Sequence, residues 1–503
     1  MALQEPREAA PGQHGNQPGA TGSNTPGASA APQEPPAPHW AMLPIILIGT
    51  FVITLDVFIV NVAIPATQRD LHAGSSAVEF IVAGYALAYA AGLITGGRLG
   101  DLYGRRRMFL IGVALFTLSS AWAGSAPTAG QLVAARVAQG LASALMGPQV
   151  LAIIGTVYSG PARIRAFNAF GLTMGLAGVF GQLIGGVLIH LDIAGLSWRT
   201  CFLVNVPIGI AALVFAPRVV PESKAQGKSR LDPLGMLLVS AGLVAVVLPL
   251  AEGQQKGWPE WTWVCLAASP VLLALFALYQ RRLAAADRGP LVNPALFRQR
   301  SFTVGVSTAL VYYSGMASFF LVLALYLQQG CGLSALDSGL VFLPLGVGFL
   351  GVSLTAKQIA AVLGRQTLAV GALVLTASLI GLYAAVEHIG THGAVAWLVP
   401  GLLVGGAGMA MVMAPLATVA LAGTDPRYAG AASGVLSTAN QVGGAIGVAL
   451  VGVVFYHVLG NGTGPDAYAD AFRASVYLLV PFALGVAALV QLFPRPPKKA
   501  PTS

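Results

Sequence analysis

Three ionisable residues stand inside long apolar stretches of this chain: Asp56, Glu79 and Arg136. An ionisable group in apolar surroundings is costly, so each is a candidate for chemistry rather than for packing alone. A carboxyl group in a weakly hydrated site can bind and release protons near neutral pH. We therefore expect Asp56 to exchange protons, Glu79 to be a second proton or cation site, and Arg136 to tune a carboxylate or relay protons. Three alternatives stay open: a structural Asp56–Arg136 ion pair, a solvated helix end at Glu79, and a purely structural anchor at Arg136.

A second group of charges lies in "GGRLGDLYGRRR", residues 96–107, where four arginines, four glycines and one acid fill twelve residues. The glycines allow a tight turn and a close approach between helices. The carboxylate of Asp101 can pair with an arginine and can also face the N-terminus of a neighbouring helix. A generic basic loop would explain the arginines but neither Asp101 nor the glycines.

The elements that must position these residues are membrane-spanning helices. The 503 residues are 56% hydrophobic and 9% charged, and their mean hydropathy is +0.75, whereas soluble proteins are about 45–50% apolar and about 25% charged. Apolar runs long enough to cross a bilayer as helices recur fourteen times. The sequence therefore predicts an all-α polytopic membrane protein, with spans at about 42–64, 78–97, 108–124, 129–150, 166–190, 200–217, 234–251, 261–280, 303–328, 338–356, 367–387, 394–415, 429–456 and 473–492.

The basic residues set the expected orientation. Of the 27 lysines and arginines, 22 fall on the side shared by both termini, four fall on the other side, and Arg136 lies within a span. Basic residues gather on the cytoplasmic side, so both termini are predicted to be cytoplasmic. The same rule explains the net charge of +9 without nucleic-acid binding. The three cysteines have no spacing typical of disulfides or of a metal site, so we expect neither a disulfide nor a bound metal.

Several stretches resemble motifs of one family. "GRLGDLYGRR" (97–106) resembles the loop 2–3 signature of the major facilitator superfamily. Four further stretches resemble motifs of its fourteen-helix drug/proton antiporter branch, the multidrug efflux type: "LDVFIVNVAIP" (55–65), "RVAQG" (136–140), "WRTCFLVNVPIG" (198–209) and "AGAASGVLSTANQVGGAIGVAL" (429–450).

The resemblance implies a particular organisation. Six-helix bundles are expected at 42–217 and 301–492, with two additional helices within 218–300, a disordered cytoplasmic tail at 1–41 and a short tail at 493–503. It also implies that Gly97, Asp101, Gly104 and Arg105 form a conformational latch that holds one access state. For a partly exposed ion pair, such a latch is worth on the order of 1 kcal/mol.

Two stretches depart from the family pattern. In "GVFGQLIGG" (178–186), Gln182 stands where the antiporter motif has a proline. Proline would bend the helix by removing a backbone hydrogen bond, which Gln182 cannot do. In "KQIAAVLGR" (357–365), the second-half counterpart of the latch loop, Gly364 and Arg365 survive but Ala361 takes the place of the acid. An asymmetric latch is therefore expected.

A substrate cavity between the bundles needs polar and aromatic side chains. Polar groups within spans need partners, so the following are expected to face inward: Asn61, Gln139, Gln182, Asn205, Asn440 and Gln441. Aromatic rings suit apolar ligands, and Tyr85, Tyr89 and Phe320 are candidates. Interhelical bonding and packing remain the alternatives for each of these side chains.

The sequence favours a proton-coupled exporter of hydrophobic drugs, antibiotics or metabolites, which acts by alternating access. Carboxylates in the cavity would favour cationic substrates. The resemblance implies no cofactor besides the proton gradient, a monomer, the bacterial plasma (inner) membrane, and a role in antibiotic resistance. The first alternative is an uptake or facilitative carrier of the same fold, which Gln182 favours. A polytopic membrane enzyme is a remote alternative, because no membrane-edge loop carries an acidic or metal-binding cluster.

Overall fold

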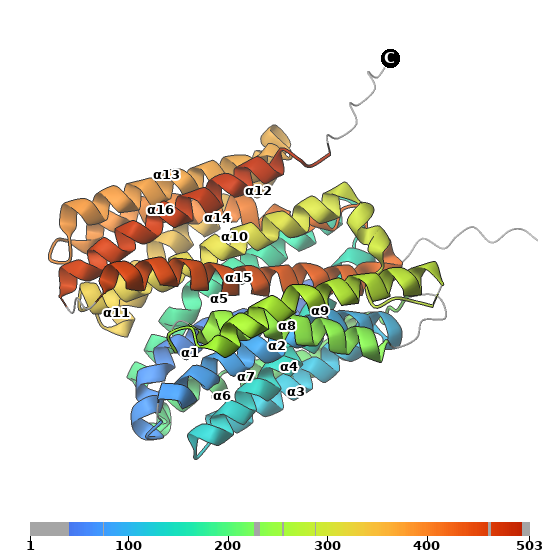
Figure 1. The fold of residues 1–503 in the computed structure, drawn as a ribbon, viewed down its shortest axis with the longest axis horizontal. Coiled ribbons are helices and arrows are strands. Elements are labelled where there is room, and N and C mark those ends of the chain that lie inside the picture. Colours follow the sequence, from blue (N-terminus) through green and yellow to red (C-terminus); the bar gives the residue numbers. More distant parts are fainter. Residues whose placement is uncertain are drawn as a thin grey trace, which may run out of the picture. The chain divides into compact units, whose positions relative to one another are not determined.

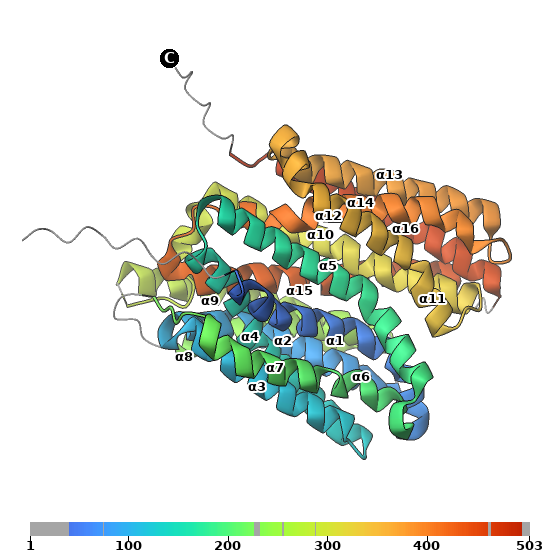
Figure 2. The same ribbon diagram turned by 180° about the vertical axis from the view of Figure 1, so that it is seen from behind.

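The computed structural model describes residues 40–73, 75–225, 232–253, 256–286, 288–460 and 464–494. These residues are almost entirely helical, and none of them lies in a strand. The predicted tail at 1–41 falls outside the described residues except for its last two. Figures 1 and 2 show the helices from opposite sides.

The first set of helices comprises α1 (Met42–Asp70), α2 (Ser75–Tyr103), α3 (Arg105–Gly124), α4 (Ala129–Val157), α5 (Gly160–Leu191), the short turns η1 (Ile193–Gly195) and η2 (Ser197–Arg199), α6 (Thr200–Leu203) and α7 (Asn205–Val219). Two further helices and a turn follow: α8 (Pro233–Glu252), α9 (Glu260–Ala285) and η3 (Pro294–Arg298). The last set comprises α10 (Arg300–Leu325), the π-helical turn η4 (Tyr326–Gly330), α11 (Ala335–Val341), α12 (Leu343–Leu363), α13 (Gln366–Ile389), η5 (Val395–Trp397), α14 (Leu398–Ala420), η6 (Pro426–Tyr428), α15 (Ala429–Leu459) and α16 (Pro465–Val490).

Thirteen helices among the described residues are long and apolar enough to cross a membrane, and the two parts of the bent α5 together supply a fourteenth span. This total equals the predicted fourteen, and the all-α membrane fold is confirmed. The boundaries differ most at α16, which begins at Pro465 rather than near 473. The first turns of α16 are polar, and its Asp470 and Arg473 form an ion pair on the helix surface, so hydropathy alone does not reveal them.

Helix α5 is bent near the position where the family motif has a proline. The helix turns by 41° between Gly178 and Phe180, although no proline lies there. Gly181 and Gly185 face α1 closely: an added Cβ would lie 2.9 Å from Cβ of Phe58 and 2.8 Å from Cγ1 of Ile59, respectively. Glycines weaken the helix locally and let it bend around its neighbour. The helix therefore bends here without the proline of the family motif.

The second set of helices repeats the contacts of the first. In the first set α1 packs on α5, α2 and α3 pack on α4, and α3 packs on α7. In the second set α10 packs on α15, α12 and α13 pack on α14, and α13 packs on α16. The sets meet where α2 contacts α15 and where α5 contacts α12 and α14. The exact bundle boundaries at 217 and 301 stay predictions.

Two additional helices, α8 and α9, lie beside these sets. Helix α8 packs against α2 and α15, where the two sets meet (Figure 1), and α9 packs on α8. The hydroxyl of Ser240 on α8 donates to the carbonyl oxygen of Ala91 on α2 at 2.8 Å. Apolar contacts join Ile94 of α2, Val239 and Leu243 of α8, and Val435 of α15. The pair therefore covers the line of contact between α2 and α15.

Candidate functional site

The first part of the site is a buried polar network around Asp56. The Asp56 side chain is fully buried, and its carboxylate forms an ion pair with the guanidinium of Arg136 on α4. The amide of Gln139 donates to Oδ1 of Asp56 at 3.2 Å, and the amide of Asn205 donates to the same oxygen at 3.1 Å. Three helices, α1, α4 and α7, therefore converge on one carboxylate.

Arg136 is held from several directions. Its Nε donates to the carbonyl oxygen of Ile81 at 3.0 Å, and its Nη1 donates to Oε1 of Gln139 at 3.0 Å. The ring of Tyr85 lies 4.3 Å from the guanidinium carbon, within the range of a cation–π contact. The hydroxyl of Tyr85 in turn lies 3.0 Å from that of Ser143. The arginine therefore keeps partners of its own besides Asp56.

The second part of the site is a cavity of about 620 Å³ between the two sets of helices. Five of the predicted cavity residues line it: Tyr89, Gln182, Phe320, Asn440 and Gln441. Tyr85 and Gln139 do not line it, because both belong to the buried network around Asp56. The side chains of Asn61 and Glu79 lie outside the described part of the structure.

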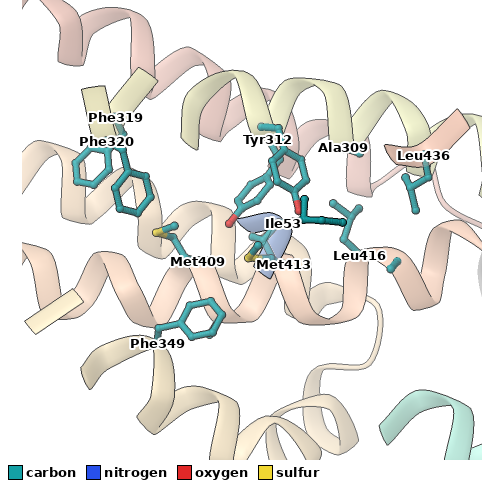
Figure 3. Close-up of a cluster of buried hydrophobic side chains, with 14 of the residues drawn as sticks. Ile53, Ala309, Tyr312, Phe319, Phe320, Phe349, Met409, Met413, Leu416 and Leu436 are labelled. Carbon is teal, nitrogen blue, oxygen red and sulfur yellow. The ribbon is translucent and has the colours of Figure 1, made fainter. Parts of the chain in front are cut away.

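The cavity wall is apolar, aromatic and amide-rich. Met174, Met316, Met413 and Tyr313 line it, and the rings of Phe58 and Phe320 lie 5.4 Å apart. Figure 3 shows Met413 on the face of α14 that is turned towards Tyr312 of α10. Methionine and aromatic side chains adapt to varied apolar ligands.

Charge is absent from the described lining of the cavity. Its polar groups are neutral, and they include Thr50, Thr54, Gln328, Gln329 and Ser437. The Oδ1 atom of Asn440 is buried without a hydrogen-bond partner among the described residues, so it can accept a hydrogen bond from a ligand. Asp56 is not in the wall, which differs from the expectation that carboxylates would face the substrate.

The third part of the site is the predicted latch. Asp101, near the end of α2, accepts hydrogen bonds from the backbone N–H groups of Gly430 and Ala431, both at 3.0 Å. These groups belong to the first turn of α15, where the helix dipole favours an anion. Arg105 donates to Oδ1 of Asp101 at 2.7 Å and 3.2 Å. Gly97 permits the approach, because an added Cβ would lie 2.2 Å from the carbonyl oxygen of Gly430.

The latch pair is buried rather than partly exposed as expected. Asp101 is 1% exposed and Arg105 is 2% exposed. Water therefore screens the pair little, and removing one partner of a buried pair costs more than the roughly 1 kcal/mol expected for an exposed pair.

The segment that follows α7 contacts the loop between α2 and α3, next to the latch. Glu222 accepts hydrogen bonds from the backbone N–H groups of Arg106 and Arg107, both at 3.1 Å, and so caps the start of α3. Gly104, at φ +110°, lies against this carboxylate, and an added Cβ would lie 2.7 Å from it. The N–H of Ala225 donates to the carbonyl oxygen of Asp101 at 2.9 Å.

The corresponding loop of the second set also has a glycine at positive φ, and the bond described for its arginine stays within the second set. Gly364, between α12 and α13, also has a positive φ, of +51°. Arg365 donates to the carbonyl oxygen of Phe493 at 2.6 Å, a residue that follows α16. The side chain of Ala361 lies outside the described part of the structure.

Sequence reasoning missed two contacts of the site. It singled out the stretch that contains Asn205 but did not place this side chain on Asp56. It gave no role to Glu222, whose only signal is its position just after the sixth predicted span. Nothing in the spacing indicates that Glu222 turns back to the loop between α2 and α3.

Comparison with known proteins places this geometry in a family. The profile of the Major Facilitator Superfamily matches residues 46–448. The chain is 38% identical over 457 residues to the "Probable actinorhodin transporter" of Streptomyces coelicolor, covering 90% of this chain and 78% of that protein. It is 35% identical to the "Puromycin resistance protein pur8" of Streptomyces alboniger, covering 93% of each. The human organic anion transporter MFSD10 has a similar fold, with a TM-score of 0.62 at 15% identity over 91% of this chain and all of that one.

Proposed function

Because the chain belongs to the Major Facilitator Superfamily, we propose that it exports amphiphilic, antibiotic-like molecules across a bacterial inner membrane in exchange for protons. Transport rather than catalysis is proposed, since the family and the relatives named above are transporters or confer resistance. The observation that carries the proposal is the cavity of about 620 Å³ between the two sets of helices, which has the size of a drug-binding pocket.

The position of the cavity fits one stage of alternating access. Asp101 joins α2 to α15 at one end of the helices. The cavity lining reaches Ile64 of α1 and Gln328 and Gln329 beyond α10, towards the opposite end. The latch end carries most of the basic residues, so we assign it to the cytoplasm together with both termini. The structure is then closed towards the cytoplasm.

The cavity wall supports a substrate class. Its described residues offer aromatic rings, methionines and neutral amides but no charge. Such a wall suits uncharged aromatic molecules that carry a few hydrogen-bonding groups, and it favours cations less than the sequence suggested. The relatives' names, which refer to actinorhodin and puromycin, agree with an antibiotic-like substrate.

The proposed coupling group is Asp56. It lies beside the cavity rather than in it, so substrate and proton occupy different places. We propose that protonation of Asp56 releases Arg136 and thereby loosens α1 from α4. The cation keeps its bonds to Ile81 and Gln139 and its contact with Tyr85, so the neutralised state does not leave it unpartnered.

Transport in membrane vesicles tests the proposal. Energised inverted vesicles that contain the protein should accumulate a panel of aromatic antibiotics and dyes, and a protonophore should abolish the accumulation. Equilibration that the protonophore leaves unchanged would instead establish the facilitative carrier that Gln182 suggested. Empty-vector vesicles and the Asp56→Asn variant are the matched controls.

A further inference from the structure

Asn205 has a hydrogen-bonding arrangement that distinguishes it from every other partner of Asp56. Its side chain is fully buried, and its amide nitrogen donates to Oδ1 of Asp56 at 3.1 Å. Its own oxygen, Oδ1, has no hydrogen-bond partner among the described residues. A buried acceptor without a partner destabilises the folded protein, so a position that keeps one calls for a reason.

The second amide on the same carboxylate oxygen is fixed. Oε1 of Gln139 accepts from Arg136 at 3.0 Å, and its nitrogen donates both to Asp56 and to Ser120, the latter at 2.8 Å. Turning the Gln139 amide over would place its NH₂ group against a guanidinium that can only donate. Asn205 has no such restraint, because nothing described holds its oxygen.

The two charge states of Asp56 need opposite partners. An ionised carboxylate only accepts hydrogen bonds, whereas a protonated carboxyl also donates one. An NH₂ group that cannot turn over can donate to the ionised carboxylate, but it offers no acceptor for the proton of the neutral carboxyl group. Because Asp56 and Asn205 are fully buried, a carboxyl proton without an acceptor would make the protonated form unfavourable.

Resting on the proton exchange proposed above, we propose that Asn205 is a positioning residue that follows the charge of Asp56. While Asp56 is ionised, the amide nitrogen donates to it, as in the structure. When a proton binds to Oδ1 of Asp56, the amide flips and its oxygen accepts the new O–H group. Both charge states are then hydrogen-bonded, and the exchanged proton has an acceptor on α7, away from the substrate cavity.

Infrared difference spectroscopy on the purified full chain tests this directly. Asparagine is labelled at its side-chain carbonyl carbon, and spectra are recorded across a pH titration. We expect one labelled carbonyl band to shift to lower frequency on acidification, together with the appearance of a protonated carboxyl band. Both changes should be absent in Asp56→Asn, and the amide shift should be absent in Asn205→Leu.

Transport measurements give a second, independent test. Asn205→Leu keeps the branched shape of the side chain, in a larger volume, but can neither donate nor accept a hydrogen bond. We expect proton release linked to substrate binding to fall by roughly tenfold or more. Substrate affinity should stay within roughly threefold, because Asn205 does not line the cavity. Asn205→Thr, which can donate and accept, should recover part of the release. Gln280→Leu removes a buried amide far from Asp56 along the chain and should leave proton release unchanged.

The outcomes separate this inference from the proposed function. A carboxyl band that titrates through Asp56 while the amide band stays fixed would overturn the flip and leave proton exchange at Asp56 intact. The absence of any carboxyl band that depends on Asp56 would overturn both.

Discussion

Replacing Asp101 with asparagine should release the latch by an amount that the geometry sets. Arg105 lies four residues further along the same chain, so its pair with Asp101 is not a contact between the two sets of helices. Among the described residues, the bonds of Asp101 across the two sets come from the N–H groups of Gly430 and Ala431. Asparagine offers one oxygen to these two donors, so Asp101→Asn keeps one bond and loses the other.

A hydrogen bond to a charged group contributes about 1.5–3 kcal/mol. Losing one of the two bonds therefore shifts the ratio of closed to open protein by roughly 30-fold for a central value of about 2 kcal/mol. Spin labels at positions 103 and 422, both exposed at the latch end of the molecule, report this ratio as a distance distribution. The three native cysteines are first replaced.

The matched control is Asp425→Asn at the same end of the molecule. Hydrogen bonds from Arg427 hold the pKa of Asp425 below its usual value, so this variant also removes a carboxylate charge at neutral pH. The pair of Asp425 and Arg427 is solvent-exposed and lies within one loop, and its loss should change the ratio by less than about fivefold. A folded Asp101→Asn protein whose distance distribution matches the wild type would refute the assignment of the latch.

Three further predictions concern other parts of the molecule. Gly97→Leu should hold the cytoplasmic end open, because a Cβ at this position would lie 2.2 Å from the carbonyl oxygen of Gly430. Transport should stop while substrate binding stays measurable, and normal transport rates would contradict this contact. Asn440→Leu should weaken binding of a hydrogen-bonding substrate by roughly tenfold, as measured by isothermal titration, while an unchanged affinity would remove Asn440 from the site. A cysteine introduced at position 226 should react with impermeant maleimide only in inverted vesicles, and labelling in intact cells would overturn the assigned topology.

The features that follow from local physical chemistry were predictable from the sequence. The number of membrane-spanning helices follows from hydropathy, because crossing a bilayer requires long apolar helices. The contact of Asp101 with a helix N-terminus follows from the glycines and arginines around it. The partner of Asp56 was predictable only as an alternative, because two ionisable groups in one bundle can pair or stay apart.

The remaining features depend on tertiary packing. The bend of α5 arises where glycines pack against Phe58 and Ile59, which no local pattern indicates. The exclusion of Asp56 from the cavity depends on which side of α1 faces α4 and α7. Glu222 acts 116 residues away from the N–H group that it caps, so its role requires the folded chain.

Substrate-induced proton release from the purified protein tests the central claim most directly. The protein in weakly buffered detergent is mixed with an aromatic antibiotic that it exports, and the pH of the solution is followed. The account predicts release in the wild type and in Gln280→Leu, whose buried amide does not line the cavity, and no release in Asp56→Asn. Undiminished release in Asp56→Asn, with release abolished in Glu79→Gln, would contradict the account and move proton exchange to α2.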